Sequence, residues 1–235
     1  MKKIAIMQPY FLPYIGYFQL MNAVDEFVVY DNIQFTKKGW IHRNRILENG
    51  KDAYVSLPLK KDSDYLDIKD RFLADNFCKQ KLKILSKIKS NYIKAPFFKE
   101  IFPIVEDIFL FENENLFEFV FNSLLVLKKH LEIETDIIIS SKIDIDHNLK
   151  FTSKVKAIVK KQKANIYINP IGGLNLYNKS DFKKDDIDLF FLKTNDFSYN
   201  QRDNEFINFL SIIDLLFFND KNFISKCLNE NFEII

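Results

Sequence analysis

The residues best suited to bind an anion follow the second apolar run of the chain, Phe27–Tyr30. They are amide, imidazole and cationic side chains: Gln34, Lys37, His42, Arg43, Asn44 and Arg45. Guanidinium and ammonium groups suit phosphates and carboxylates, and the imidazole is a candidate general base. A solvated basic loop is the alternative. Trp40 lies within the stretch and favours a ligand site, because an aromatic ring in a polar loop often packs against a ligand or a partner.

A second set of candidate residues follows the first apolar run, Lys3–Met7. A glycine at position 16 would let the backbone approach a ligand, and the helix expected after it offers free N–H groups with a partial positive charge. Close packing of the helix on the sheet explains this glycine equally well. Side chains here that could orient a ligand in a partly open pocket are Gln8, Tyr14 and Tyr17.

The segment Ser140-Ser141-Lys142 follows the apolar run 136–139. Its two hydroxyls and its ammonium group could bind phosphates. A helix N-cap or a turn is the more common reason for such serines, so this segment alone is a weak indication of a site.

The pair Gly172-Gly173 follows the apolar run 165–168 and holds two of the five glycines in the chain. In a chain so poor in glycine, the pair indicates a positive φ or a close approach of the backbone to another group. We interpret this loop, together with Tyr177, as facing a ligand; a tight turn is the alternative.

Asp214 lies within an otherwise apolar segment with helical spacing. A carboxylate on an apolar stripe must find a hydrogen-bonding partner or change its pKa. It is a candidate general base, although a buried structural pair explains it at least as well.

The composition excludes several classes of protein. The chain has 34 Lys and Arg against 32 Asp and Glu, and a net charge of +2 gives no general reason to bind DNA or a membrane surface. Its two cysteines lie far apart, and its three histidines form no HExxH motif, so we expect no zinc site, no disulfide framework and no bound metal. No apolar run approaches the roughly 20 residues of a membrane-spanning helix, so we expect a cytoplasmic protein.

The apolar runs predict an α/β fold with a mostly parallel open sheet of about five to six strands, because the strands alternate with helices. We expect residues 1–74 and 132–235 to form the two halves of the sheet and residues 75–131 to form a helical insert or cap. We expect these parts to belong to one compact domain. The strands are predicted over 3–7, 27–30, 53–57, 136–139, 165–168 and 189–192. The helices are predicted over 15–24, 75–90, 97–111, 114–131, 150–162, 205–218 and 221–229. Ligands of such sheets bind beyond the carboxyl ends of the strands, where the candidate residues gather.

Five segments of the chain resemble the WbqC-like protein family, and the resemblance extends from Ile4 to about Asn219. They are Gln8-Pro9-Tyr10-Phe11-Leu12-Pro13-Tyr14-Ile15-Gly16-Tyr17-Phe18-Gln19-Leu20, Tyr30-Asp31-Asn32-Ile33-Gln34-Phe35, Gly39-Trp40-Ile41-His42-Arg43-Asn44-Arg45-Ile46, Asn169-Pro170-Ile171-Gly172-Gly173 and Leu210-Ser211-Ile212-Ile213-Asp214. Members of this family are associated with bacterial surface-polysaccharide (O-antigen) gene clusters. Some carry the label of a glycine or aminoacyl transferase to an amino sugar.

A more distant resemblance links the chain to nucleotidyl transferases with a HIGH motif, such as pantothenate synthetases. Tyr14-Ile15-Gly16-Tyr17 stands where these enzymes place His-x-Gly-His, Asn32-Ile33-Gln34-Phe35 looks like part of their Asn-Pro-x-Gln-Phe segment, and Ser140-Ser141-Lys142 looks like their Ser-Ser-Arg loop. The resemblance implies catalytic roles for Tyr17 and Lys142. Tyrosines replace both histidines of the motif, so either adenylate chemistry is absent or the cations come from Lys37, Arg43 and Arg45.

These resemblances imply an enzyme of polysaccharide biosynthesis that transfers an acyl or aminoacyl group, with glycine as a candidate, to a nucleotide-linked amino sugar. The implied cofactor is ATP or a nucleotide-sugar with Mg²⁺, and an aminoacyl donor is a further implied partner. Arg43, Arg45 and Lys142 would hold phosphates. A non-catalytic protein that binds a nucleotide-sugar, or a nucleotidyltransferase, are the alternatives.

Overall fold

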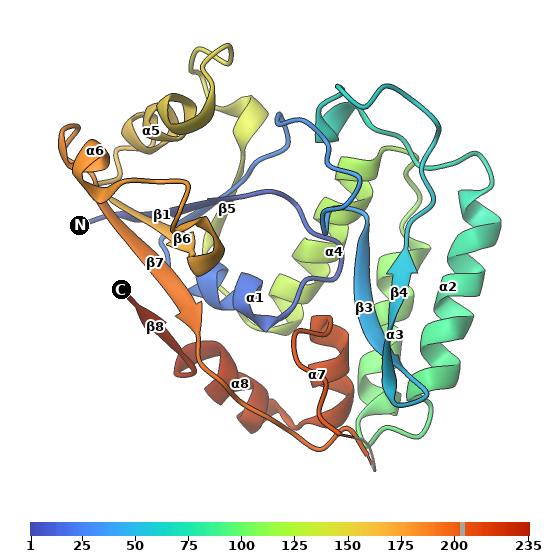
Figure 1. Ribbon diagram of the computed structural model, residues 1–235. Coiled ribbons are helices and arrows are strands. Elements are labelled where there is room, and N and C mark those ends of the chain that lie inside the picture. The colour runs from blue at the N-terminus through green and yellow to red at the C-terminus, as the bar shows by residue number, and fades with distance from the viewer. Residues whose placement is uncertain (203–204) are drawn as a thin grey trace.

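A six-stranded sheet forms the centre of the computed structural model, which describes residues 1–202 and 205–235 (Figure 1). Its strand order is β5-β2-β1-β6-β7-β8. Neighbours among the first five strands pair in parallel, and β8 pairs with β7 in the antiparallel sense. The strands are β1 (Lys3–Met7), β2 (Glu26–Val29), β5 (Asp136–Ile139), β6 (Ile166–Pro170), β7 (Asp188–Thr194) and β8 (Phe232–Ile234).

The residues of β1 alternate between two hydrophobic cores, as the period of two of a strand requires. Ala5 belongs to one core, and Ile4 and Ile6 belong to the core on the other face of the sheet. A strand that is buried on both faces reads as a continuous apolar run, which is why the sequence predicted it. The prediction of an α/β fold with a mostly parallel sheet is confirmed. The order of the parallel strands is that of a doubly wound sheet, with the switch between β1 and β6.

Helices cover both faces of this sheet (Figure 1). The core that contains Ile4 and Ile6 also contains Val155 and Phe182 from the helices on that face, and the other core includes Phe18 and Leu228. The helices on the first face are α5 (Phe151–Lys161) and α6 (Lys179–Lys183), and those on the second are α1 (Ile15–Asn22) and α8 (Lys221–Asn229).

Three helices lie in the predicted helical segment: α2 (Phe77–Tyr92), α3 (Phe98–Leu110) and α4 (Leu116–His130). They share one core with the sheet, because the ring of Phe11 packs 6.0 Å from Phe109 and 6.3 Å from Phe119. The helix predicted over 205–218 is shorter and begins at Ile212 (α7, Ile212–Phe218). Each helix in the described part of the chain is too short or too polar to cross a bilayer.

A separate two-stranded hairpin stands beside the helical segment (Figure 1). It consists of β3 (Arg43–Glu48) and β4 (Lys51–Ser56), and the two residues between them, Asn49 and Gly50, have φ of 51° and 73°. An Asn-Gly pair with positive φ at both positions is the favoured two-residue hairpin turn. The predicted loop at Arg43–Arg45 is therefore wrong, and the strand predicted over 53–57 belongs to this hairpin and not to the main sheet.

Candidate functional site

The carboxyl ends of β2 and β5 are joined by polar side chains. The Asp31 carboxylate accepts hydrogen bonds from the backbone nitrogen and the hydroxyl of Ser141, at 2.8 and 2.5 Å. The Ser140 hydroxyl donates to Asn32 Oδ1 at 2.8 Å. Ser140 to Lys142 form a short 3-10 turn, in which the Lys142 side chain is exposed. The two serines thus hold neighbouring strand ends together, and Lys142 extends into solvent.

Lys154 of α5 lies over these strand ends and is only 5% exposed. Its ammonium group donates to the carbonyl oxygen of Asn32 at 3.0 Å and lies 5.2 Å from the ring centre of Tyr30. Within residues 1–202 and 205–235 it forms no ion pair with a carboxylate. Burial lowers the pKa of Lys154, an effect that the charges of Asp67 and Asp31 oppose. The ammonium group has three N–H donors, so a ligand can accept from those that Asn32 leaves free.

Two tyrosines and a further carboxyl group complete this edge of the sheet. Burial, the Tyr177 hydroxyl and the charge of Asp67 raise the pKa of Tyr30 to about 12. Burial also raises the pKa of Tyr177, and Tyr30 and Tyr177 therefore remain hydrogen-bond donors at neutral pH. Burial is the largest cause of the raised pKa of Asp67, followed by the charge of Asp70.

We call these residues the switch-edge cluster, because they come from helix α5 and from the segments that follow strands on both sides of the switch between β1 and β6. The cluster consists of Tyr30, Asp31, Asn32, Asp67, Ser140, Ser141, Lys154 and Tyr177. It combines one nearly buried cation with hydroxyl and amide groups and a carboxyl group of raised pKa. Such a set can bind an anionic group and transfer a proton next to it.

Gly16 and Gly173, one glycine from each of the two predicted ligand loops, have packing roles. A Cβ atom on Gly16 would lie 2.2 Å from Tyr14 Oη and 2.6 Å from Thr194 Oγ1. A Cβ atom on Gly173 would lie 1.8 Å from Asn169 Nδ2, whereas a Cβ atom on Gly172 would meet open space. Neither Gly172 nor Gly173 has a positive φ. The glycine pair predicted a close approach of the backbone to another group. At Gly173 that group is the side-chain amide of Asn169.

The first loop is held by buried contacts. The Tyr17 side chain is buried, and its hydroxyl donates to the backbone oxygen of Gln8 at 3.1 Å. Burial raises the pKa of Tyr17 well above its usual value. Tyr14 is half-buried, with its ring packed edge-on against Phe209 at 5.9 Å. Tyr17 therefore positions the loop between β1 and α1, and Tyr14 lies against the segment that covers the start of α1.

The structure places Arg43, Asn44 and Arg45 on β3 of the hairpin, outside the main sheet. Arg43 donates to the backbone oxygens of Gly39 and Lys38, at 3.2 and 2.8 Å. Asn44 is buried and donates to the backbone oxygens of Phe11 and Leu12, and Arg45 pairs with Asp52 at 3.1 Å. Arg43 thus contacts the segment before β3, Asn44 contacts the loop between β1 and α1, and Arg45 joins the two strands of the hairpin.

His42 and Lys37 line a separate hollow of about 350 Å³ beside the hairpin. We call it the basic hollow, and its lining residues are Phe35, Lys37, His42, Leu57, Leu59, Lys60, Lys61, Asp62 and Arg71. Burial and the charges of Arg43 and Arg71 lower the pKa of His42 to about 4. Gln34 lies outside this lining, exposed, and its side chain donates to the backbone oxygen of Asp64 at 2.9 Å.

Asp214 is fully buried at the start of α7, and its carboxylate has three partners. It accepts hydrogen bonds from the hydroxyls of Tyr92 and Tyr199, at 2.6 and 2.7 Å, and from the side-chain amide of Gln201 at 2.8 Å. Burial raises the pKa of Asp214, and these three hydrogen bonds oppose the rise. Asp214 therefore has the position of a buried structural group, which is the alternative given for it in the sequence analysis.

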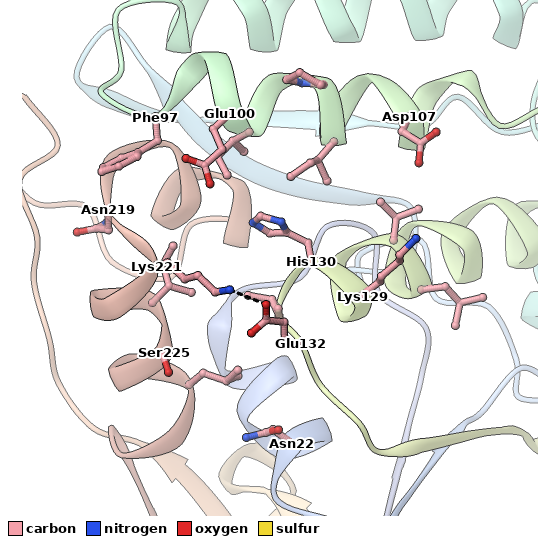
Figure 2. Close-up of a pocket in the computed structure, with 18 of the residues that line it drawn as sticks. Asn22, Phe97, Glu100, Asp107, Lys129, His130, Glu132, Asn219, Lys221 and Ser225 are labelled. Carbon is pink, nitrogen blue, oxygen red and sulfur yellow. Dashed lines mark hydrogen bonds and ion pairs between the residues drawn. The ribbon is translucent and has the colours of Figure 1, made fainter.

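A larger groove of about 920 Å³ lies at the opposite end of the sheet. It is bounded by the ends of α1 and α4, which lead into the amino ends of β2 and β5, and by α3 and α8. Figure 2 shows His130 between Glu100 and Lys221, and Lys221 paired with Glu132 at the rim. Its lining comes from four separate helices, and no local pattern in the sequence indicated it. In doubly wound sheets the ligand site is at the carboxyl ends, so we place the main site at the switch-edge cluster.

The family model of the WbqC-like protein family matches residues 8–226. The chain belongs to the WbqC-like protein family. One curated relative of this family member is the uncharacterized protein Rv1507c of Mycobacterium tuberculosis, which is 34% identical over 115 residues. That match covers 48% of this chain and 48% of the relative, so it spans about half of each protein. No solved structure matches the chain.

Three residues that the structure places at the switch-edge cluster or the basic hollow were not predicted from the sequence. They are Lys154, Asp67 and Arg71. Lys154 lies on the buried stripe of α5 together with Val155 and Ile158, and a lysine at that spacing was the available signal. Asp67 and Arg71 belong to the segment around a short 3-10 turn, Ile68–Asp70. Their positions depend on backbone pairing of this segment with residues 31–35, which no local pattern indicates.

Proposed function

We propose that this WbqC-like protein binds a nucleotide-linked amino sugar at the switch-edge cluster and transfers an acyl or aminoacyl group to its amine. Glycine is the candidate acyl group, and the product enters a bacterial surface polysaccharide. The observation that carries the proposal is Lys154, a nearly buried cation at the carboxyl edge of a doubly wound sheet whose hydrogen bond goes to a neutral carbonyl. An anionic group of a ligand, such as a diphosphate, would offset the cost of burying that charge.

The neighbouring residues support binding of the sugar end of such a ligand. Asn32 Nδ2 lies within hydrogen-bonding distance of His147 Nδ1, at 2.9 Å, so an exposed imidazole stands beside the end of β2. Tyr30 and Tyr177 retain their hydroxyl protons and can donate to hydroxyl or carbonyl oxygens of a substrate. Lys154 would hold the phosphates, and these donors would orient the group that reacts.

Asp67 is the general base that we assign to the transfer. Its raised pKa makes its carboxylate a better proton acceptor, and it is near enough to Lys154 for the two charges to interact. The sugar amine attacks the acyl carbonyl carbon and forms the C–N bond. The bond from that carbon to the donor oxygen breaks, the donor leaves with the electron pair, and Asp67 takes the amine proton.

The acyl donor is either an aminoacyl ester or an acid activated with Mg-ATP. In the part of the chain that the structure describes, no group of three His, Cys, Asp or Glu side chains could hold a metal. Mg²⁺ would therefore be bound mainly through the phosphates of the nucleotide, as is usual for this ion. Lys154 and the backbone around Asn32 are the residues that would meet those phosphates.

A non-catalytic role in nucleotide-sugar binding is the second candidate function. It is favoured by the positions of Tyr17 and Asp214, because both are buried and fully engaged with other protein groups. One experiment separates the two functions. A dTDP- or UDP-linked amino sugar is incubated with the protein and either glycine with Mg-ATP or a glycyl ester, and amide formation is followed by mass spectrometry. An amide product, with pyrophosphate exchange if ATP activates the acid, supports the transferase. Tight binding of the sugar nucleotide without any product supports the binding protein.

A further inference from the structure

Arg71 is a buried cation that forms no ion pair with an acidic side chain in the described part of the chain. It is 3% exposed, and it donates to the backbone oxygens of Ser63 and Lys60 at 2.7 and 3.3 Å. Its guanidinium carbon lies 4.9 Å from the ring centre of Phe35. Its Nε atom is shielded from solvent and has no hydrogen-bond acceptor within residues 1–202 and 205–235. A buried charge whose described partners are all neutral groups is costly, and a nearby anion would offset that cost.

His42 adds a second unsatisfied nitrogen to the same hollow. Its Nδ1 atom is also shielded from solvent and lacks a partner within the described ranges, and its ring packs 5.4 Å from Phe35. Burial, and then the charges of Arg43 and Arg71, lower the pKa of His42. Buried polar atoms are nearly always hydrogen-bonded, so two unpartnered nitrogens in the wall of one hollow, within the described ranges, are unusual.

The rim of the basic hollow carries three further cations, Lys37, Lys60 and Lys61, against one lining acid, Asp62. Lys37 and Lys60 pair with Asp64 and Asp75 at 2.7 and 3.0 Å, but all four of these side chains are more than half exposed. Exposed pairs of this kind contribute little, so a ligand that carries more negative charge can displace them.

The remaining walls of the hollow are apolar. Leu57 is buried, Leu59 is half-buried, and Phe35 lies between the Arg71 and His42 side chains. At about 350 Å³, the hollow is within the size range of small-molecule sites. It therefore offers a cationic part for an anion and an apolar part for an organic group.

We propose that the basic hollow binds a phosphorylated small molecule. The phosphate lies among Lys37, Lys61 and the floor formed by His42 and Arg71, and the organic part packs on Leu57 and Leu59. A phosphate fits better than a carboxylate, because four cations line the hollow and a dianion neutralises more of them. This site shares no residue with the switch-edge cluster, so the inference does not rest on the proposed transfer reaction.

Pyrophosphate is the first probe, titrated into the full chain by isothermal calorimetry at low and at moderate ionic strength. The Lys37→Ala/Lys61→Ala variant should bind it about tenfold more weakly, because two rim charges are lost. The matched control is Lys83→Ala/Lys94→Ala, which removes two exposed lysines of the α2 region outside the hollow and should leave the affinity unchanged. Equal weakening in both variants, or no binding to the native protein, would overturn the proposal. Malonate that binds as tightly as pyrophosphate would also overturn it, in favour of a carboxylate ligand.

A second readout uses the native protein and needs no variant of the buried Arg71. The charged groups that face His42 are Arg43 and Arg71, with Lys37, Lys60, Lys61 and Asp62 in the lining of the hollow. A bound phosphate should raise the pKa of His42 from about 4, because it places negative charge beside the imidazole. Proton NMR titration of the histidine ring with and without pyrophosphate measures this shift. A His42 pKa that is unchanged at saturating pyrophosphate would show that the anion binds elsewhere.

Discussion

Lys154 on α5 donates its ammonium hydrogen bond to the backbone oxygen of Asn32, the residue whose side chain also contacts Ser140 and His147. This one residue links helix α5, the end of β2 and the end of β5. The link places a cation where the parallel strands end, and it leaves the cation without a carboxylate partner within the described ranges. The site proposed above depends on this relationship.

Replacement of Lys154 by methionine should weaken ligand binding and leave the stability of the fold nearly unchanged. Methionine has a similar volume without the charge, so we expect a free energy of unfolding within about 1 kcal/mol of the native value at pH 7. Because burial depresses the pKa of Lys154 in the folded state, its charge opposes folding at neutral pH. That effect is lost as the pH rises through the folded pKa towards 10.5, so any gain from Lys154→Met should shrink over that range. Urea unfolding at pH 7 and at pH 10 tests this, and a loss of several kcal/mol at pH 7 would contradict it.

Asp67→Asn should greatly slow transfer without unfolding the protein. Loss of a general base typically lowers kcat by about 10² or more, and the acidic limb of the pH–rate profile should disappear with it. Since the pKa of Asp67 is raised in the folded state, its ionised form opposes folding above pH 3.8. The variant should thus be slightly more stable than the native protein at pH 7 and equal to it at low pH. Unchanged kcat with native stability would exclude Asp67 as the base.

Asp214→Asn tests the structural role of the buried carboxylate. The substitution puts an N–H donor opposite the donating hydroxyls of Tyr92 and Tyr199, so we expect a loss of about 2–3 kcal/mol in the free energy of unfolding. Tyr92→Phe should cost about 1–2 kcal/mol, because Tyr92 also accepts a hydrogen bond from the Leu47 backbone at 2.9 Å. Chemical denaturation measures both. A stable Asp214→Asn variant with greatly reduced kcat would instead support catalysis by Asp214.

The two adjacent glycines provide a matched pair. Gly173→Ala should destabilise the protein by about 1–3 kcal/mol, because its Cβ atom would overlap the Asn169 amide at 1.8 Å. Gly172→Ala should stay within about 0.5 kcal/mol of the native stability, because open space surrounds that position. Thermal unfolding of both variants is sufficient. Equal effects on stability would contradict this assignment, and weaker substrate binding by Gly172→Ala alone would show that a ligand approaches this loop.

Much of the fold followed from the sequence, because buried parallel strands such as β1 and β2 read as apolar runs and α2 to α4 repeat their apolar residues with helical spacing. The hairpin was missed, because β3 begins with Arg43-Asn44-Arg45 and looks like a polar loop. Its turn, Asn49-Gly50, was the local signal that could have revealed it.

The candidate site was less accessible to sequence reasoning. Asp214 was expected to need a partner, but its partners Tyr92 and Tyr199 lie 122 and 15 residues away in the chain. Likewise Asn32 meets Ser140 and Lys154 only after β2, β5 and α5 have packed. Contacts between side chains so far apart in the chain depend on tertiary packing, which residue spacing in one sequence does not specify.

The most direct test of the central claim is calorimetric titration of a dTDP-linked amino sugar with a free amine into the native protein and into Lys154→Met. The control is Lys160→Met, which removes a more exposed lysine from the same helix. Our account predicts binding by the native protein and the control, and at least tenfold weaker binding by Lys154→Met with its fold intact. Equal affinity in all three proteins, or no binding by the native one, would contradict the assignment of the switch-edge cluster as the nucleotide-sugar site.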